Sequence, residues 1–247
     1  MTRQSIVITG ASDGIGQAVA WEMAKRGYDL GLTARRLSKL EQTKKKIEEK
    51  FPCIRVSVFE LDVTEHSRVS LMLDHFRCEL DKIDILMVNA GIAISGRIGV
   101  MPLEDQLKVI DTNLSASIAV VSKGIEVFRE QGAGHVVATS SIAGFLGLPR
   151  NAAYSASKAA LSIYMEALRA ETIKEKIDVT VVNPGYIDTA INRGMASRPF
   201  VINVEEGARQ FANAIERKAQ IVTVPGFPWR ILGKIMKVLP VSIVAKM

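Results

Sequence analysis

The most informative segment of this chain reads Thr9-Gly10-Ala11-Ser12-Asp13-Gly14-Ile15-Gly16. It follows an apolar run at residues 4–9 that predicts a buried strand, and it precedes an apolar-periodic run that predicts a helix. In a dinucleotide-phosphate turn, the first glycine permits the tight turn, the second lets the backbone approach the pyrophosphate, and the third lets the helix pack closely. A lone glycine-rich turn is a weak signal, but this one lies between a strand and a helix and therefore favours a dinucleotide-binding fold.

Strand-like and helix-like segments alternate along the rest of the chain. Further strands are predicted at residues 29–33, 55–61, 84–88, 135–139, 178–182 and 221–224, and helices at 37–50, 65–80, 101–131, 154–174 and 204–217. This alternation predicts a Rossmann-like α/β domain, with a doubly wound, predominantly parallel seven-stranded sheet and helices on both faces. We therefore expect one dinucleotide-binding and catalytic domain at residues 1–224, a substrate lid at about 186–203, and a basic amphipathic extension at 225–247.

The composition is that of an ordinary globular protein, with 48% hydrophobic and 23% charged residues. The formal net charge of +6 concentrates in residues 35–50 and beyond Pro225 and is not interleaved with aromatic residues, which argues against a nucleic-acid partner. Cys53, Cys78 and the three histidines show no metal-binding or redox spacing, so we expect no metal and a reducing, cytoplasmic location. We expect neither a secretory signal nor a membrane-spanning helix.

The second predicted strand ends in Ala34-Arg35-Arg36, where the Rossmann pattern places the residue that selects the ribose. An acidic residue there would bond the 2′-hydroxyl of NAD, whereas an arginine presents a planar fork to the 2′-phosphate of NADP. We therefore expect NADP(H) rather than NAD(H), with Arg35 as the main contact. Arg36 is nearly as well explained by solvation of the following helix start, and Asp13 weakens the expectation, because a carboxylate does nothing for a 2′-phosphate.

Polar residues follow the carboxyl ends of the other predicted strands, where doubly wound sheets bind their ligands. Asp62 follows the third strand and Ser141 follows the fifth. Tyr154 and Lys158 stand one turn apart on the next helix, so they share a face. A fixed positive charge beside a phenol would lower its pKa from about 10 and make it a proton-transfer group. A surface tyrosine followed by a solvated lysine would explain the pair alone, but its position at this sheet edge favours an active site.

Together these motifs strongly resemble the short-chain dehydrogenase/reductase family, in its short single-domain subgroup. The resemblance extends from Ser5 to about Val224, and the serine precedes the tyrosine by thirteen positions, the usual family interval. The matching positions are Thr9-Gly-x-x-x-Gly-x-Gly16, Asp62, Asn89-Ala-Gly91, Asn113, Ser141, Tyr154-x-x-x-Lys158, and Pro184-Gly185 with Thr189.

The resemblance implies an oxidoreductase that transfers a hydride between nicotinamide and a carbonyl or secondary alcohol. Tyr154 would be the general acid/base, and Ser141 would hold the substrate oxygen. Lys158 would bond the nicotinamide ribose and lower the Tyr154 pKa, while Asn113 would help to place a water that connects Lys158 to solvent. The residues expected to line the cofactor are Gly10, Ser12, Asp13, Gly14, Ile15, Gly16, Arg35, Arg36, Asp62, Val63, Asn89, Ala90, Gly91, Tyr154, Lys158, Pro184, Gly185, Ile187 and Thr189.

Two further expectations accompany the resemblance. Homodimers or homotetramers would form through the helices that hold Asn113 and Tyr154. The alternative to an enzyme is a catalytically silent protein of the same fold that senses NADP(H) or acts as a scaffold. Such a protein would need the glycines but not the intact catalytic set, which favours the enzyme.

Apolar residues surround the expected substrate position, and they suit a hydrophobic ketone or alcohol better than a sugar. They could equally be the packed core of the lid. The set comprises Ile92, Ile94, Ile142, Phe145, Leu146, Leu148 and Tyr186.

The segment beyond Pro225 is basic and amphipathic, with no acidic residue through Met247. It can lie on an anionic membrane surface, or it can bury its apolar face against a subunit or its own lid. We expect packing on protein and keep peripheral membrane contact through residues 229–239 as the alternative. The apolar face would carry Trp229, Leu232, Ile235, Met236 and Leu239, and the basic face Arg230, Lys234 and Lys237.

Overall fold

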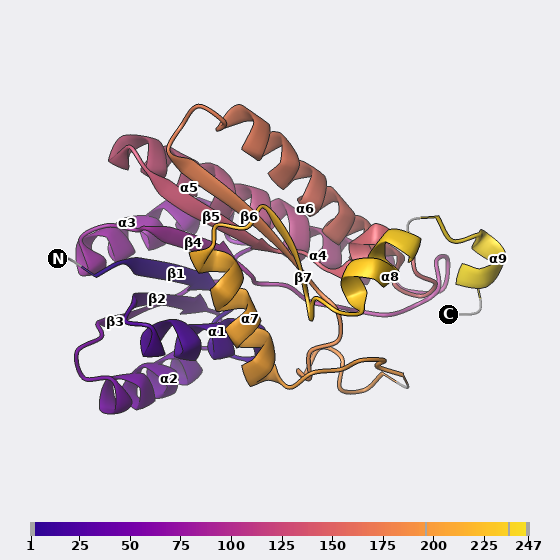
Figure 1. The fold of residues 1–247 in the computed structure, drawn as a ribbon, viewed down its shortest axis with the longest axis horizontal. Helices are drawn as coiled ribbons and strands as arrows, with labels where there is room; N and C mark the ends of the chain where they lie inside the picture. The colour runs from indigo at the N-terminus through magenta and orange to yellow at the C-terminus, as the bar shows by residue number, and fades with distance from the viewer. Residues whose placement is uncertain (1–2, 196, 237, 246–247) are drawn as a thin grey trace.

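The computed structural model describes residues 3–195, 197–236 and 238–245. Within them, seven strands form one sheet in the order β3-β2-β1-β4-β5-β6-β7, and every pairing is parallel. The predicted doubly wound parallel sheet is therefore confirmed (Figure 1). The strands are β1 (Ser5–Thr9), β2 (Asp29–Ala34), β3 (Val56–Glu60), β4 (Ile85–Val88), β5 (Gly134–Thr139), β6 (Ile177–Pro184) and β7 (Ile221–Val224).

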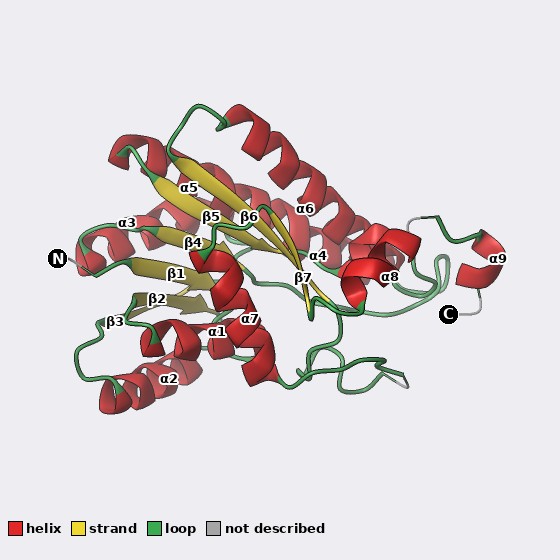
Figure 2. Ribbon diagram, in the orientation of Figure 1, coloured by secondary structure: helices red, strands yellow, loops and turns green. Residues whose placement is uncertain are grey.

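Helices cover both faces of the sheet (Figures 1 and 2). One face packs against α1 (Gly14–Lys25), α2 (Leu37–Lys50) and α7 (Val204–Glu216). The other packs against α3 (Val69–Leu80), α5 (Ala116–Gln131) and α6 (Ala152–Glu171). Because both faces are covered, the strands read as continuous apolar runs rather than as alternating ones. The carboxyl ends of all seven strands meet at one edge, which leaves that edge free for a site.

The predicted helix at 101–131 is helical from Leu103 to Gln131, but it contains a π-helical turn that the sequence pattern did not show. It consists of α4 (Leu103–Ile110), a five-residue π-helical turn at Asp111–Ser115, and α5. Asn113 lies at the centre of this turn and is fully buried. A π turn inserted into an α-helix frequently marks a functional site.

The C-terminal segment folds back onto the carboxyl edge of the sheet (Figure 1). Helix α8 (Trp229–Met236) packs on the 3-10 turn Ile142–Phe145 that follows β5, and α9 (Val241–Val244) ends the described chain. The contact is close, because a Cβ atom on Gly233 would lie 2.6 Å from the Phe145 ring. None of the helices in the described ranges is long and apolar enough to cross a bilayer.

The expected apolar face of this segment is largely confirmed. Trp229, Leu232, Met236 and Leu239 join one cluster with the turn after β5, so this face does pack on protein. Ile235 was assigned to the same face but is exposed. Lys237, expected on the basic face, lies outside the described residues.

Candidate active site

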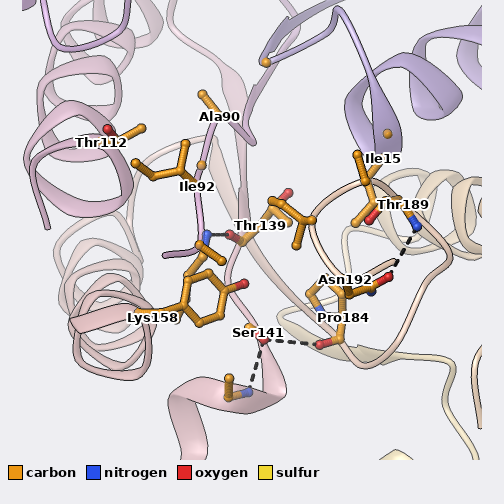
Figure 3. Close-up of a pocket in the computed structure, with 18 of the residues that line it drawn as sticks. Ile15, Ala90, Ile92, Thr112, Thr139, Ser141, Lys158, Pro184, Thr189 and Asn192 are labelled. Atoms are coloured by element: carbon orange, nitrogen blue, oxygen red, sulfur yellow. Dashed lines mark hydrogen bonds between the residues drawn. The ribbon is translucent and has the colours of Figure 1, made fainter. Parts of the chain in front are cut away.

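The carboxyl ends of the strands open onto a pocket of about 1420 Å³. Pockets for a single small ligand typically have volumes of roughly 300–1000 Å³. The pocket therefore has room for an extended dinucleotide together with a second molecule. The glycine-rich turn lines one end, and Ser141, Tyr154, Lys158 and α8 line the other. Figure 3 shows Ile15 at the first end and Ser141 and Lys158 at the second.

The glycine-rich turn fits closely against the sheet and against itself. Gly10 has φ +69, and a Cβ atom there would lie 2.8 Å from Ala90 Cα. A Cβ atom on Gly16 would lie 2.5 Å from the Gly10 carbonyl oxygen. Neither position can carry a side chain without a backbone shift, so the glycines fix the start of α1 at the pocket wall. Gly16 itself packs behind the turn and does not line the pocket, unlike the other residues expected around the cofactor.

Two arginines border the same end of the pocket, each beside a carboxylate. Arg36 Nη2 donates to Ser12 Oγ at 3.1 Å and lies 3.3 Å from Asp13 Oδ2, while Arg35 Nη1 lies 3.8 Å from Asp62 Oδ2. Burial alone would raise the pKa of Asp13, but the Gly14 amide and Arg36 outweigh it and lower that pKa. Asp13 therefore stays ionised and is paired with Arg36 from the start of α2, so the reservation that it raises about a 2′-phosphate remains.

Asn89 joins the ends of three strands beneath the pocket. Its Nδ2 donates to the Thr9 carbonyl at 3.0 Å, and its Oδ1 accepts from Thr139 Oγ1 at 3.2 Å. The side chain of Asn89 therefore holds β1, β4 and β5 in register where the central part of a dinucleotide would lie.

Asn113 acts as a clamp behind the pocket rather than as part of its wall. Its Oδ1 accepts from the Ile92 amide at 2.8 Å, and its Nδ2 donates to the Ile92 carbonyl at 2.9 Å and to Ser157 Oγ at 3.1 Å. Both amide hydrogens are thus engaged, and the side chain ties the segment after β4 to α6. Asn113 reaches this position from the π turn within the long helix.

Lys158 and Tyr154 face the far end of the pocket. Lys158 is 4% exposed, its Nζ donates to the Thr139 carbonyl at 2.8 Å, and burial lowers its pKa to about 8 (Figure 3). The Nζ atom lies 5.9 Å from the centre of the Tyr154 ring. The short distance agrees with the expectation that both groups share one site.

The expected direction of the Tyr154 pKa is wrong. Burial raises the pKa of Tyr154, and the hydrogen bond with the Ser141 hydroxyl offsets this only in part. Removal from water disfavours the phenolate, and the Lys158 ammonium is directed at the Thr139 carbonyl rather than at the phenol. Ser141 is held in place by the Ala143 amide, which donates to its Oγ at 3.1 Å.

The segment predicted to be a lid, described at residues 186–195 and 197–203, is joined at its base and passes close to the glycine turn, where a Cβ atom on Gly14 would lie 3.5 Å from Thr189. Ile187 and Ile202 form a parallel bridge between its two ends. Asn192 Nδ2 donates to the Ile187 carbonyl at 2.8 Å, and its Oδ1 accepts from the Thr189 amide at 3.4 Å (Figure 3). Asn192 could not be predicted from the sequence, because residues 186–203 have no periodic pattern that would mark a buried polar residue.

The apolar end of the pocket differs in part from the expected lining. Ile92, Ile142, Leu148 and Tyr186 do line it. Ile94 belongs instead to a separate small pocket, and Phe145 and Leu146 pack beneath α8.

Two lining residues that the sequence did not indicate, Trp229 and Met236, come from α8. The Trp229 ring lies against Gly185, where a Cβ atom would be 2.6 Å from the indole nitrogen, and it makes edge contacts with Tyr186 and Phe200. Helix α8 thus closes the end of the pocket opposite the glycine turn.

The parallel sheet, the glycine turn at a helix start, and the serine, tyrosine and lysine in one pocket together define a dinucleotide-dependent oxidoreductase. A family model described as short chain dehydrogenase matches residues 4–199. The chain belongs to the short-chain dehydrogenase/reductase family and is an NAD(P)-dependent enzyme of that family. Helices α7 and α8 and strand β7 lie beyond the matched residues.

Similar proteins support the same assignment. An uncharacterized oxidoreductase of Mycobacterium tuberculosis is 39% identical over 241 residues, covering 97% of this chain and 95% of its own. An NADP-dependent 3-hydroxy acid dehydrogenase of Schizosaccharomyces pombe is 32% identical, covering 75% of this chain and 72% of its own. The structure of a short chain dehydrogenase/reductase from Burkholderia phymatum in complex with NAD has a TM-score of 0.85 at 22% identity, covering 94% of this chain and 92% of its own. The last comparison shows the shared fold.

Proposed function

We propose that this protein is an NADP(H)-dependent oxidoreductase that interconverts an apolar carbonyl compound and its secondary alcohol, with Tyr154 as the general acid/base. The observation that carries the proposal is one continuous pocket. Two arginines and the glycine turn line one end, and Ser141, Tyr154 and Lys158 line the other.

The residues at the far end of the pocket have complementary tasks. Hydride transfer is the chemistry that a bound nicotinamide supplies. Tyr154 stays protonated at neutral pH because its pKa is raised, which suits it to donate a proton to the carbonyl oxygen during reduction. Ser141 is bonded to the same phenol and can hold that oxygen. The Lys158 ammonium lies beside Gly91, where a Cβ atom would be 3.5 Å from Nζ. In this position it would bond and orient the nicotinamide ribose.

The test of the acid role is Tyr154→Phe. It should abolish turnover of ketones while leaving NADPH affinity nearly unchanged, because only the proton donor is lost. Tyr164→Phe is the matched control, since Tyr164 lies on the same helix and bonds Ser122 instead of lining the pocket. Activity retained by Tyr154→Phe would remove the proposed role. NADPH binding without turnover of any ketone by the natural protein would favour the silent sensor or scaffold.

The preference for NADP(H) rests on Arg35 and Arg36. Both are exposed at the turn end of the pocket, where their guanidinium groups can meet a 2′-phosphate. The named yeast relative is NADP-dependent, whereas the Burkholderia structure contains NAD, so the fold serves both cofactors. Arg35→Gln should weaken NADPH binding by roughly 10- to 100-fold, the value of a charge-assisted hydrogen bond, and change NADH binding little. Equal affinities of the natural protein for NADPH and NADH, measured by calorimetry, would contradict this assignment.

Substrate class and assembly complete the proposal. The side chains of Ile142, Trp229 and Met236 at the catalytic end favour an apolar substrate, which screening of NADPH consumption across aliphatic, aromatic and acyl ketones would test. We propose a homodimer or homotetramer through α4 to α6, because Leu107 on α4 and Ile163 on α6 are exposed. Exposed, unpaired cysteines are consistent with a cytoplasmic location.

A further inference from the structure

Helix α8 has a second face that points away from the pocket. Trp229, Gly233 and Met236 are its buried side. Arg230 and Lys234 follow each other one turn apart on the next ridge and are exposed. Ile231 and Ile235 form a third ridge, opposite the buried side, and are 52% and 47% exposed.

The same apolar character continues on both sides of this helix. Phe227 precedes α8 and is 80% exposed, while Val238 and Val241 follow it and are 78% and 83% exposed. Ile243 on α9 is also exposed. Six large apolar side chains within 17 residues exceed what scattered surface hydrophobes explain. We call this set, together with Arg230 and Lys234, the C-terminal surface. It lies at the end of the molecule that carries α8 and α9, away from α2 and α3 (Figure 1).

Charge identifies the kind of partner. Residues 225–247 contain basic side chains and no aspartate or glutamate. Exposed apolar residues beside cations, without any carboxylate, are the chemistry that binds the interface of an anionic bilayer. We propose that the C-terminal surface docks on an anionic lipid membrane, with its apolar side chains in the interface and Arg230 and Lys234 at the headgroups.

A second copy of this chain is the less favourable occupant. A two-fold interface centred on this surface would bring Arg230 and Lys234 toward the same residues of the partner copy. The segment offers no carboxylate to compensate these cations, so their burial would be costly. A bilayer that contains phosphatidylserine supplies the missing negative charge.

Docking in this way has a consequence for the pocket. The opposite side of α8, with Trp229 and Met236, lines the apolar end of the pocket. A docked molecule therefore holds that end within one helix diameter of the lipid, roughly 10–12 Å. Membrane binding does not depend on the proposed enzymatic activity and can be measured without it.

The test is cosedimentation of the full chain with vesicles of roughly one-third phosphatidylserine in phosphatidylcholine, and with phosphatidylcholine alone, at about 0.1 M salt. The natural protein should partition onto the anionic vesicles and weakly onto the neutral ones. Arg230→Gln with Lys234→Gln should lower the partition coefficient roughly 30-fold, from about fivefold for each juxtamembrane cation. Lys45→Gln with Lys46→Gln, on exposed α2, changes net charge equally and should have little effect.

The apolar component is tested separately. Val241→Ser should lower binding on the order of tenfold, whereas Ile173→Ser, at a position that is also exposed but distant in sequence, should not. Unchanged circular dichroism would show that each variant is folded. The proposal is overturned if the natural protein does not bind anionic vesicles. It is overturned as well if the double variant at Lys45 and Lys46 lowers binding as much as the double variant at Arg230 and Lys234. It is also overturned if Val241→Ser reduces the oligomer size in solution and leaves vesicle binding unchanged, since a second copy would then be the occupant.

Discussion

Lys158→Met should stabilise the free protein at neutral pH while removing activity. Burial lowers the pKa of Lys158 from 10.5 to about 8, and each pKa unit corresponds to 1.36 kcal/mol, so holding the charged ammonium costs roughly 3 kcal/mol. Because the pKa of Lys158 is lower in the folded state, the unfolded state binds one proton more than the folded state between about pH 8 and pH 10.5. The cost is complete below about pH 8 and is relieved as the pH rises toward 10.5.

The hydrogen bond from Lys158 to the Thr139 carbonyl opposes this cost. Bonds to charged groups contribute about 1.5–3 kcal/mol, which leaves a net gain for Lys158→Met of roughly 0–2 kcal/mol at pH 7. Methionine keeps the apolar stem packed and removes the ammonium together with its hydrogen bond to the Thr139 carbonyl.

The assay is urea unfolding of both proteins without cofactor between pH 7 and 9.5. Over this range the natural protein should gain about 2 kcal/mol of unfolding free energy relative to Lys158→Met. Lys174→Met, at an exposed position, is the control and should leave the pH profile unchanged. Parallel pH profiles for the natural protein and Lys158→Met would refute the reasoning. So would a free energy of unfolding for Lys158→Met that is more than about 1 kcal/mol below that of the natural protein at pH 7.

Two further predictions concern buried polar residues. Burial lowers the pKa of His135 from 6.5 to about 4. The neutral imidazole therefore contributes fully to the free energy of unfolding above pH 6.5, and roughly 3 kcal/mol of that free energy is lost as the pH falls from 6.5 through 4. His135→Gln should flatten urea-unfolding profiles between pH 4 and 6.5, and an unchanged slope would contradict the assignment. Asn113→Leu leaves the Ile92 amide and carbonyl unpaired and should cost roughly 2–4 kcal/mol in the same assay. A loss below about 1 kcal/mol would show that water replaces the clamp.

Local pattern and topology were sufficient to predict the sheet, the glycine turn and the residues that meet at the strand ends. Helix α2 and strand β7 have the predicted bounds, because each is a single run of one periodicity. Tyr154, Ser141 and the cofactor residues converge for a geometric reason, since parallel strands expose their carboxyl ends on one edge. No contact between distant residues had to be known for these predictions.

The remaining features depend on tertiary contacts that no local pattern records. The π turn at Asp111–Ser115 arises where Asn113 meets the backbone of Ile92, a partner twenty-one positions away in sequence. The Tyr154 pKa follows from how much water the surrounding chain removes, whereas the sequence shows only that a lysine is near. Trp229 reaches the pocket because α8 folds back over Gly185, and its apolar periodicity alone does not say which surface it covers.

The two ends of the pocket are constrained by different kinds of contact. These contacts determine at which positions the chain can accept substitutions. At the turn end, Gly10 and Gly16 face backbone atoms that cannot move without distorting the sheet. At the other end, Trp229 lies against Gly185, but Trp229 and Met236 otherwise contact side chains such as Phe200 and those of the turn after β5, which can repack. We therefore expect substitutions in α8 to cost less stability than substitutions at Gly10 or Gly16. Helix α8 lies beyond the residues that the family model matches, and its sequence is therefore where we expect the proposed substrate end of the pocket to vary.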